Sequence, residues 1–195
     1  MSAMKTALLA SYEKDEALQR LGKLLIDNGW TLLGSAGTAK YLMDHSIPCR
    51  DVASIVGPPI LGHRVVTLAR EVYAGLLAET DDDAEELRKL GIAPIDLVYV
   101  TLYPLEATIG DPEATPKDVI EKTDIGGPTL LRAAAKGRRL ALSNPAQIDA
   151  LEAWIKSGAK DTERATLTLR FAAAAERRVA EYVDASARYW ERKAA

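Results

Sequence analysis

Short apolar runs alternate with amphipathic stretches along residues 1–160. The run Ile95–Leu102 is nearly continuous, rich in β-branched residues and flanked by prolines, which is typical of a buried strand. Leucines at helical spacing, beginning with Leu18, predict amphipathic helices between such runs. The pattern predicts strands at Thr6–Ala10, Trp30–Leu33, Pro48–Val52, Ile95–Leu102 and Leu140–Leu142, and helices from Leu18 to Asp27 and over Ala39–His45, Ala84–Leu90, Pro116–Lys122, Asp124–Lys136 and Ile148–Lys156.

Strands that alternate with helices predict an α/β fold with a mainly parallel sheet and helices on both faces. Such sheets bind ligands beyond the carboxyl ends of their strands. The loops after Ala10, Leu33 and Leu102 are therefore the expected site loops. Residues 161–195 differ, because Leu167, Phe171, Ala175, Val179, Tyr182, Val183, Ser186, Tyr189 and Trp190 lie near one stripe. We predict an α/β domain at 1–160 and, at 161–195, one or two helices that pack on it or on a partner subunit.

Composition narrows the function classes. The net charge of −3 is a poor match for a nucleic-acid binder, and no apolar run is long enough for a membrane span or signal peptide. The single cysteine, Cys49, favours a reducing, cytoplasmic setting. With only His45 and His63, a His/Cys metal cluster and a Ser-His-Asp hydrolase are disfavoured. We expect acid–base chemistry from Asp, Glu, Lys or Tyr, and no metal.

Three loops carry candidate chemistry. Gly34–Thr38 combines small residues and hydroxyls before a helix, which suits a phosphate, although a plain strand-to-helix turn has the same composition. Arg64 and Thr67 could hold a phosphate, or Arg64 could be an ordinary surface residue. Tyr103 ends the strongest strand, where it is either a hydrogen-bond donor or an aromatic cover of the strand end.

The segment Asp124–Lys136 is the most unusual. Asp124 could accept helix N-terminal amides or act as a base in a glycine-lined pocket. Lys136 lies eight residues beyond Pro128, ~12 Å along a helix, so the two side chains cannot meet along it. Either the preceding loop folds back, or the two residues serve different parts of a site, as across a dimer interface. Lys136 could also be an ordinary exposed lysine.

Five segments in this order resemble the inosine monophosphate cyclohydrolase domain of the bifunctional purine-biosynthesis enzyme. They are Ser35–Lys40, Arg64–Leu68, Pro94–Leu97, Leu102–Pro104 and Asp124–Lys136. The resemblance runs from about Lys5 to Trp190. It implies a methylglyoxal-synthase-like fold, a homodimer and a phosphorylated, nucleotide-like ligand. The family's formyltransferase domain is absent from this sequence, so a separate formyltransferase is a conceivable partner.

The implied reaction is a cofactor-free ring closure. A carboxamide nitrogen attacks the neighbouring formamido group of formyl-aminoimidazole-carboxamide ribotide, and loss of water gives inosine monophosphate. By resemblance Asp124 is the base, and Lys136 and Tyr103 assist proton transfer and loss of water. The expected substrate- and phosphate-binding residues are Lys14, Ser35, Gly37, Thr38, Arg64, Val66, Thr67, Thr101, Ile125 and Gly126.

Two departures from the family pattern stand out. The family segment Arg-Val-Lys-Thr-Leu-His-Pro is replaced by Arg64–Arg70, with Val66 in the place of the lysine and no His-Pro. Losing one such oxyanion donor typically costs ~3–4 kcal/mol of transition-state stabilisation, unless another group such as Arg70 replaces it. Thr101 stands where the family has Asn before Leu-Tyr-Pro. These changes leave three alternatives open besides ordinary purine synthesis: ring closure on an analogue in specialised nucleoside biosynthesis, a catalytically impaired nucleotide-binding partner subunit, and, less favoured, a methylglyoxal-synthase-like lyase.

Overall fold

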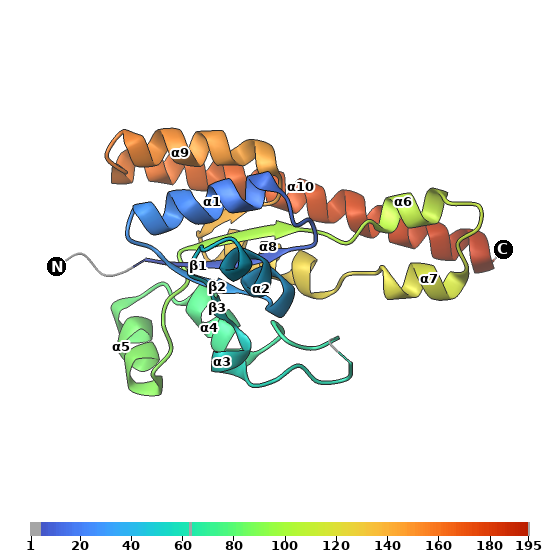
Figure 1. Ribbon diagram of the computed structural model, residues 1–195, viewed down its shortest axis with the longest axis horizontal. Coiled ribbons are helices and arrows are strands. Elements are labelled where there is room, and N and C mark those ends of the chain that lie inside the picture. The colour runs from blue at the N-terminus through green and yellow to red at the C-terminus, as the bar shows by residue number, and fades with distance from the viewer. Residues whose placement is uncertain (1–4, 63, 195) are drawn as a thin grey trace.

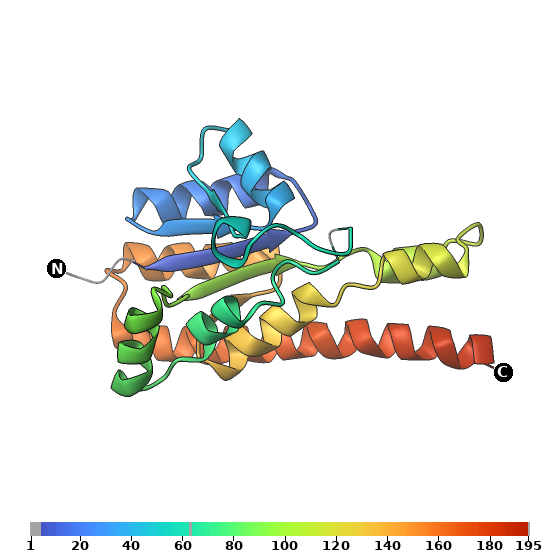
Figure 2. The same ribbon diagram turned by 90° about the horizontal axis from the view of Figure 1, so that it is seen from below.

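The computed structural model describes residues 5–62 and 64–194, so His63 lies outside the described residues. Within them, five parallel strands form one sheet in the order β3-β2-β1-β4-β5. Figures 1 and 2 show helices on both faces of this sheet, which confirms the predicted α/β fold. The elements are β1 Thr6–Ser11, α1 Glu16–Asp27, β2 Thr31–Gly34, α2 Ala36–Asp44, β3 Arg50–Asp51, α3 Ala53–Val56, α4 Arg70–Leu77, α5 Asp81–Leu90, β4 Leu97–Thr101, α6 Leu105–Gly110, α7 Pro116–Glu121, α8 Gly126–Lys136, β5 Leu140–Leu142, the 3₁₀ helix η1 Pro145–Gln147, α9 Ile148–Lys156 and α10 Asp161–Ala194.

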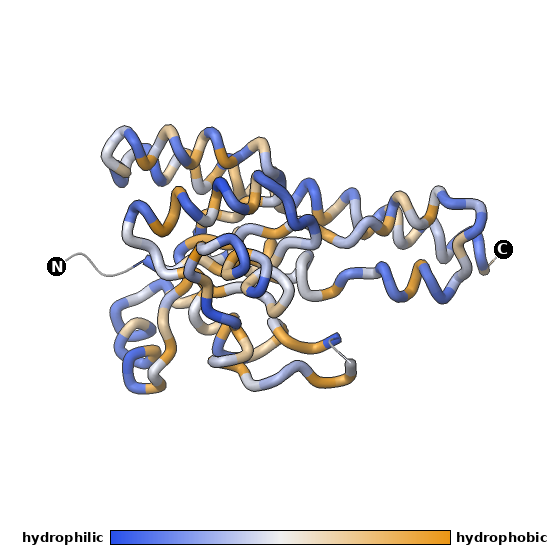
Figure 3. Tube along the Cα trace, viewed as in Figure 1, coloured by the Kyte–Doolittle hydropathy of each residue, from blue (hydrophilic) through white to orange (hydrophobic). Residues whose placement is uncertain are grey.

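The sheet separates two hydrophobic cores because successive strand residues point to opposite faces. Ala7 and Leu9 of β1 face a core shared with α1, α2, α9 and the start of α10. Leu8 faces the other core, which α4, α8 and the middle of α10 cover. Every residue of β4 is buried, as its apolar run predicts. Figure 3 shows the contrast with α5, a mostly hydrophilic helix at the edge of the fold.

Residues 161–194 form one helix. It packs along β5 and α8, and its last part extends beyond the sheet beside α6 and α7 (Figures 1 and 2). We call this projection the arm; its small core contains Leu105, Val119, Tyr182 and Tyr189. The predicted stripe is correct for most positions, but Val183 and Trp190 are exposed because two short helices cover only one side of α10.

Several boundaries differ from the predictions. α2 begins at Ala36 rather than Ala39, because Ser35 is already the extended residue before the helix. The run Asp81–Asp83 lies inside the first turn of α5, where carboxylates favour the helix N-terminus. The strand predicted at Pro48–Val52 spans only Arg50–Asp51, and α3, α4 and α6 were not predicted. α3 and α6 contain fewer than two helical turns and therefore show little periodicity. No helix in the described part of the chain has both the length and the apolar character to cross a membrane.

Candidate active site

The site residues gather where β1, β2 and β4 end, at the carboxyl edge of the sheet. Ser11 and Thr101 are direct neighbours in the β1–β4 register. Their hydroxyl oxygens lie 2.7 Å apart, and the Glu13 N–H donates to Thr101 Oγ1 at 3.1 Å. The loop after β1 is thereby tied to the end of β4. Thr101, a predicted site residue, is buried in this network.

Thr38 joins β1 to α2. Its Oγ1 accepts from the Ser11 N–H at 3.1 Å and from the Ser35 hydroxyl at 3.0 Å, and it donates to the Ser11 carbonyl at 3.2 Å. One donor and two acceptor contacts use the capacity of a hydroxyl fully. The side chain of Thr38 is fully buried, and its hydrogen bonds fix the predicted phosphate loop to the end of β1.

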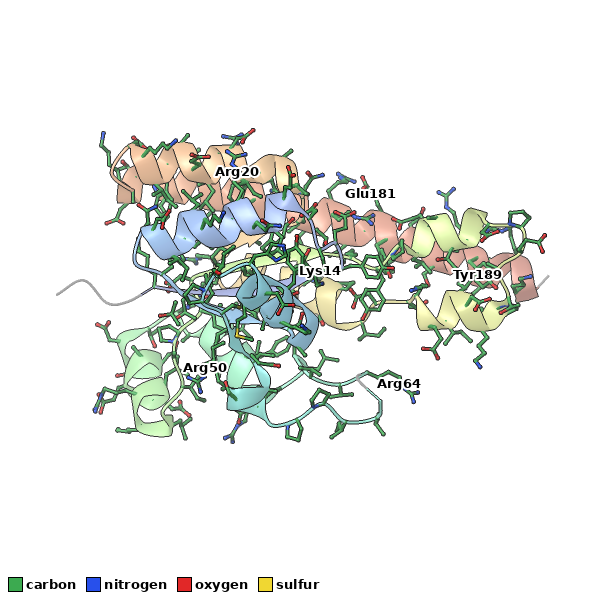
Figure 4. The ribbon with its side chains drawn as sticks, in the orientation of Figure 1. Lys14, Arg20, Arg50, Arg64, Glu181 and Tyr189 are labelled. Carbon is green, nitrogen blue, oxygen red and sulfur yellow. The ribbon has the colours of Figure 1, made fainter. Side chains whose placement is uncertain are left out.

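Lys14 lies over the first turn of α2. The Cβ that Gly37 lacks would be 3.7 Å from Lys14 Cε, and the Lys14 ammonium donates to the carbonyls of Ser11 and Tyr12. Burial lowers the pKa of Lys14 below its ordinary value. An ammonium beside a helix N-terminus favours an anion, since both contribute positive potential. Figure 4 shows Lys14 near this helix, in the middle of the molecule.

Asp124 lies just before α8, at the other side of the same edge. Its Oδ1 accepts the Gly127 N–H at 3.0 Å. Burial raises the pKa of Asp124 above its ordinary value, while N–H groups of Gly127, Tyr103 and Gly126 oppose that rise. A Cβ at Gly127 would lie 2.5 Å from Asp124 Oδ2 and 2.6 Å from Leu102 Cδ2. Only glycine therefore lets the carboxylate approach the start of α8.

Two half-exposed aromatic rings lie near these groups. The centroids of Tyr12 and Tyr103 are 5.1 Å apart, and Lys122 Nζ is 5.4 Å from the Tyr12 centroid. Tyr103 remains accessible enough to reach a ligand. Ser11, Tyr12 and Lys122 were not predicted as site residues. Ser11 and Tyr12 directly follow the predicted strand Thr6–Ala10, and Lys122 lies just before the Asp124 segment, so their positions could have indicated them.

The segment before α4 contributes unevenly. Thr67 is buried, with Oγ1 3.1 Å from the point where a Cβ on Gly126 would lie, so Thr67 reaches the start of α8. Val66 packs against the apolar core on the α8 face. Arg64 instead extends from an exposed loop, where its Nε donates to the Leu61 carbonyl at 2.8 Å (Figure 4). The structure thus places Thr67 near Asp124 and leaves Arg64 apart.

The remaining predicted residues lie at opposite ends of α8. Ile125 precedes its first residue and is exposed, and Gly126 begins it. Lys136 is its last residue and is also exposed. The preceding loop does not fold back to join them, so Asp124 and Lys136 of one chain belong to different surfaces.

Comparison with known proteins identifies the family of the chain. Residues 17–129 match the MGS-like domain family, and the chain belongs to that family. Among its relatives are bifunctional purine biosynthesis proteins PurH: that of Cyanothece sp. is 46% identical over 133 residues, covering 67% of this chain and 26% of its own, and that of Aquifex aeolicus is 41% identical over 157 residues, covering 78% and 31%. The matched part thus spans less than a third of these relatives. The crystal structure of ForH superposes with a TM-score of 0.82 and 31% identity, over 96% of this chain and 100% of ForH.

Proposed function

We propose that this chain is a cyclohydrolase. It closes a six-membered ring on a phosphorylated ribosyl azole carboxamide with loss of water. The observation that carries the proposal is a desolvated carboxylate, Asp124, at the same sheet edge as the cationic helix N-terminus formed by Lys14 and α2. β2 leads into α2, and Asp124 lies beside the end of β4, where the Tyr103 N–H bonds its carboxylate. These two strands are separated by β1 alone, or about 10 Å at ordinary strand spacing. A nucleotide can bridge the two with its phosphate at α2 and its heterocycle at Asp124.

The chemistry follows from the residues present. Asp124 takes a proton from the carboxamide nitrogen as that nitrogen attacks the formyl carbon, and a new C–N bond forms. The raised pKa of Asp124 makes it a stronger base than an exposed aspartate. Tyr103, a hydroxyl donor, hydrogen-bonds the formyl oxygen, which receives the carboxamide proton from Asp124. The formamido nitrogen then loses its proton, a C=N bond forms as the C–O bond breaks, and the oxygen takes up this second proton and departs as water. PurH relatives, whose name records purine biosynthesis, support this reaction class.

Lys136 completes the site in this proposal only from a second copy of the chain. Its distance from Asp124 along α8 is too large for a shared substrate within one chain, at 1.5 Å per residue. A homodimer that brings α8 of one copy to the carboxyl edge of the other supplies the ammonium to help expel water.

Val66 favours a second candidate function, ring closure on an analogue of the purine precursor. In the family pattern a lysine stands at this position, whereas Val66 contributes no charge or hydrogen bond and packs on the apolar core. A chain that keeps the phosphate site and the base Asp124 but replaces the family's lysine by Val66 suits a related azole carboxamide.

The test supplies formylated aminoimidazole-carboxamide ribotide and follows inosine monophosphate by absorbance. Turnover supports the purine reaction. Absence of turnover together with tight binding of a purine monophosphate would exclude that reaction, and a panel of other formamido-azole ribotides then tests the analogue. Failure to turn over any of them leaves the nucleotide-binding partner subunit.

A further inference from the structure

The backbone at Asp124 is held by a side chain from the distant helix α10. Tyr182 Oη accepts the Asp124 N–H at 2.8 Å and donates to the Lys122 carbonyl at 2.8 Å. A single hydroxyl thus closes the turn that places Asp124 before α8, across 58 and 60 residues of sequence. The side chain of Lys122 in the same turn reaches the Tyr12 ring.

Tyr182 is itself firmly placed. Its side chain is 1% exposed and lies in the arm core with Leu105 and Val119. The Arg178 guanidinium is 5.5 Å from its ring centroid, and Arg178 pairs with Glu106 of α6. Burial raises the pKa of Tyr182 to about 12, so the hydroxyl keeps its proton at neutral pH and remains a donor to the Lys122 carbonyl.

We propose that Tyr182 is a positioning residue for Asp124, holding the 122–124 turn so that the carboxylate stays partly dry beside the first turn of α8. This inference rests on the proposed function, in which Asp124 is the base. It also gives the arm a role: α6, α7 and the end of α10 enclose the residue that fixes the site turn.

The groups around Asp124 determine its titration. N–H groups of Gly126 and Gly127 from α8 and of Tyr103 from the β4–α6 connection stabilise the carboxylate, while burial destabilises it and is the larger effect. Tyr182 of α10 contacts the turn, and Lys122 lies within it. The Arg178–Glu106 pair lies against the ring of Tyr182. A looser turn admits water, so the burial effect weakens and the pKa of Asp124 falls towards its ordinary value.

The experiment compares Tyr182→Phe with Tyr189→Phe. Both remove one hydroxyl from a buried tyrosine of α10 in the same core, but only the first hydroxyl contacts the Asp124 turn. For Tyr182→Phe we expect kcat to fall about 10²-fold, as for a displaced catalytic group, with KM nearly unchanged because Lys14 and α2 are untouched. The acidic limb of the pH–rate profile should move to lower pH. Tyr189→Phe should resemble the parent in all three.

A second readout needs no turnover. Carbon-13 NMR of labelled aspartate, with the resonance assigned by Asp124→Asn, measures the pKa of Asp124 directly. Equal kcat, KM and Asp124 pKa in both tyrosine variants would refute the positioning role. If no chain turns over substrate but the Asp124 pKa falls only in Tyr182→Phe, the proposed function fails and the positioning role stands.

If Tyr182→Phe does not fold, a third measurement keeps the tyrosine hydroxyl and its contacts. Fluorotyrosine at position 182 keeps the ring and hydroxyl, and its fluorine resonance should shift as Asp124 titrates. A resonance that ignores this titration would overturn the inference.

Discussion

Replacing Asp124 by Asn separates catalysis from binding. In the parent, the Gly127 N–H donates to Asp124 Oδ1 at 3.0 Å. Asparagine has the same size and keeps an oxygen at this position, so a hydrogen bond worth about 0.5–1.5 kcal/mol is retained. It removes the proton acceptor. A positioned general base contributes about 10²–10⁴-fold, so kcat should fall by that factor. The corresponding barrier increase is about 3–5 kcal/mol at ~1.4 kcal/mol per tenfold. Affinity for a purine monophosphate should persist, because Lys14 and α2 are unchanged.

The same variant has a sharp stability signature. Because burial raises the pKa of Asp124 above its unfolded value, its protonated form stabilises the fold fully below the unfolded pKa, and this contribution is lost as pH rises through the folded pKa. Asp124→Asn should therefore be more stable than the parent above about pH 4, with the difference vanishing below it. Thermal unfolding across pH measures this directly.

Asp83→Asn on α5 is the matched control. Hydrogen bonds from the Glu79 and Thr80 N–H groups lower the pKa of Asp83, so its stabilisation is present above the unfolded pKa and lost on acidification. This variant should lose stability at neutral pH and keep full activity. Normal turnover by Asp124→Asn would show that the base is misassigned, and lower stability at neutral pH would show that burial does not dominate its titration.

Three further outcomes are expected. Val66→Lys should raise turnover of the purine substrate by up to about 10²–10³-fold, measured against Val65→Lys, and no gain would remove position 66 from the site. Asp124→Asn and Lys136→Ala chains, each inactive alone, should regain about a quarter of the parent rate when they are unfolded and refolded together. Half of the dimers then contain both variants, and each of these has one intact site of two. If no activity returns, Lys136 does not belong to the site. Gly127→Ala should abolish turnover because the added Cβ would lie 2.5 Å from Asp124 Oδ2. In the control Gly110→Ala the Cβ meets nothing within 4 Å, so its rate should match the parent. Equal rates in the two variants would refute the close approach of Asp124 to Gly127.

Local patterns were sufficient to predict most of the sheet. Thr6–Ser11 and Leu97–Thr101 are apolar runs of strand length, and their period does not depend on distant contacts. Short helices such as α6 lack that signal: six residues contain fewer than two turns, and Leu105 is buried by packing with α7 and α10. Their formation depends on tertiary packing, which local propensity does not report.

The site divides in the same way. Ser35 and Asp124 could be proposed from the sequence because each precedes a helix within a recognisable segment. Ser11 was missed because its role depends on pairing with Thr101, ninety residues away. Helix geometry predicted that Lys136 and Asp124 do not meet along α8, but it could not say whether the preceding loop folds back. The sequence also left Arg64 as either a phosphate ligand or a surface residue, and in the structure it lies on an exposed loop. A side chain's direction on an irregular loop has no period from which to predict it.

The two halves of the site are held by contacts of different range along the sequence, and this difference affects how substrate preference can change. The phosphate side is braced locally, by Thr38 between β1 and α2. The base side is braced from α10, through Tyr182. Val66 belongs to neither brace, because it packs on the core behind α8. In the proposed reaction, we therefore expect a substitution at position 66 to change the preference for the heterocycle while the phosphate site and Asp124 keep their geometry.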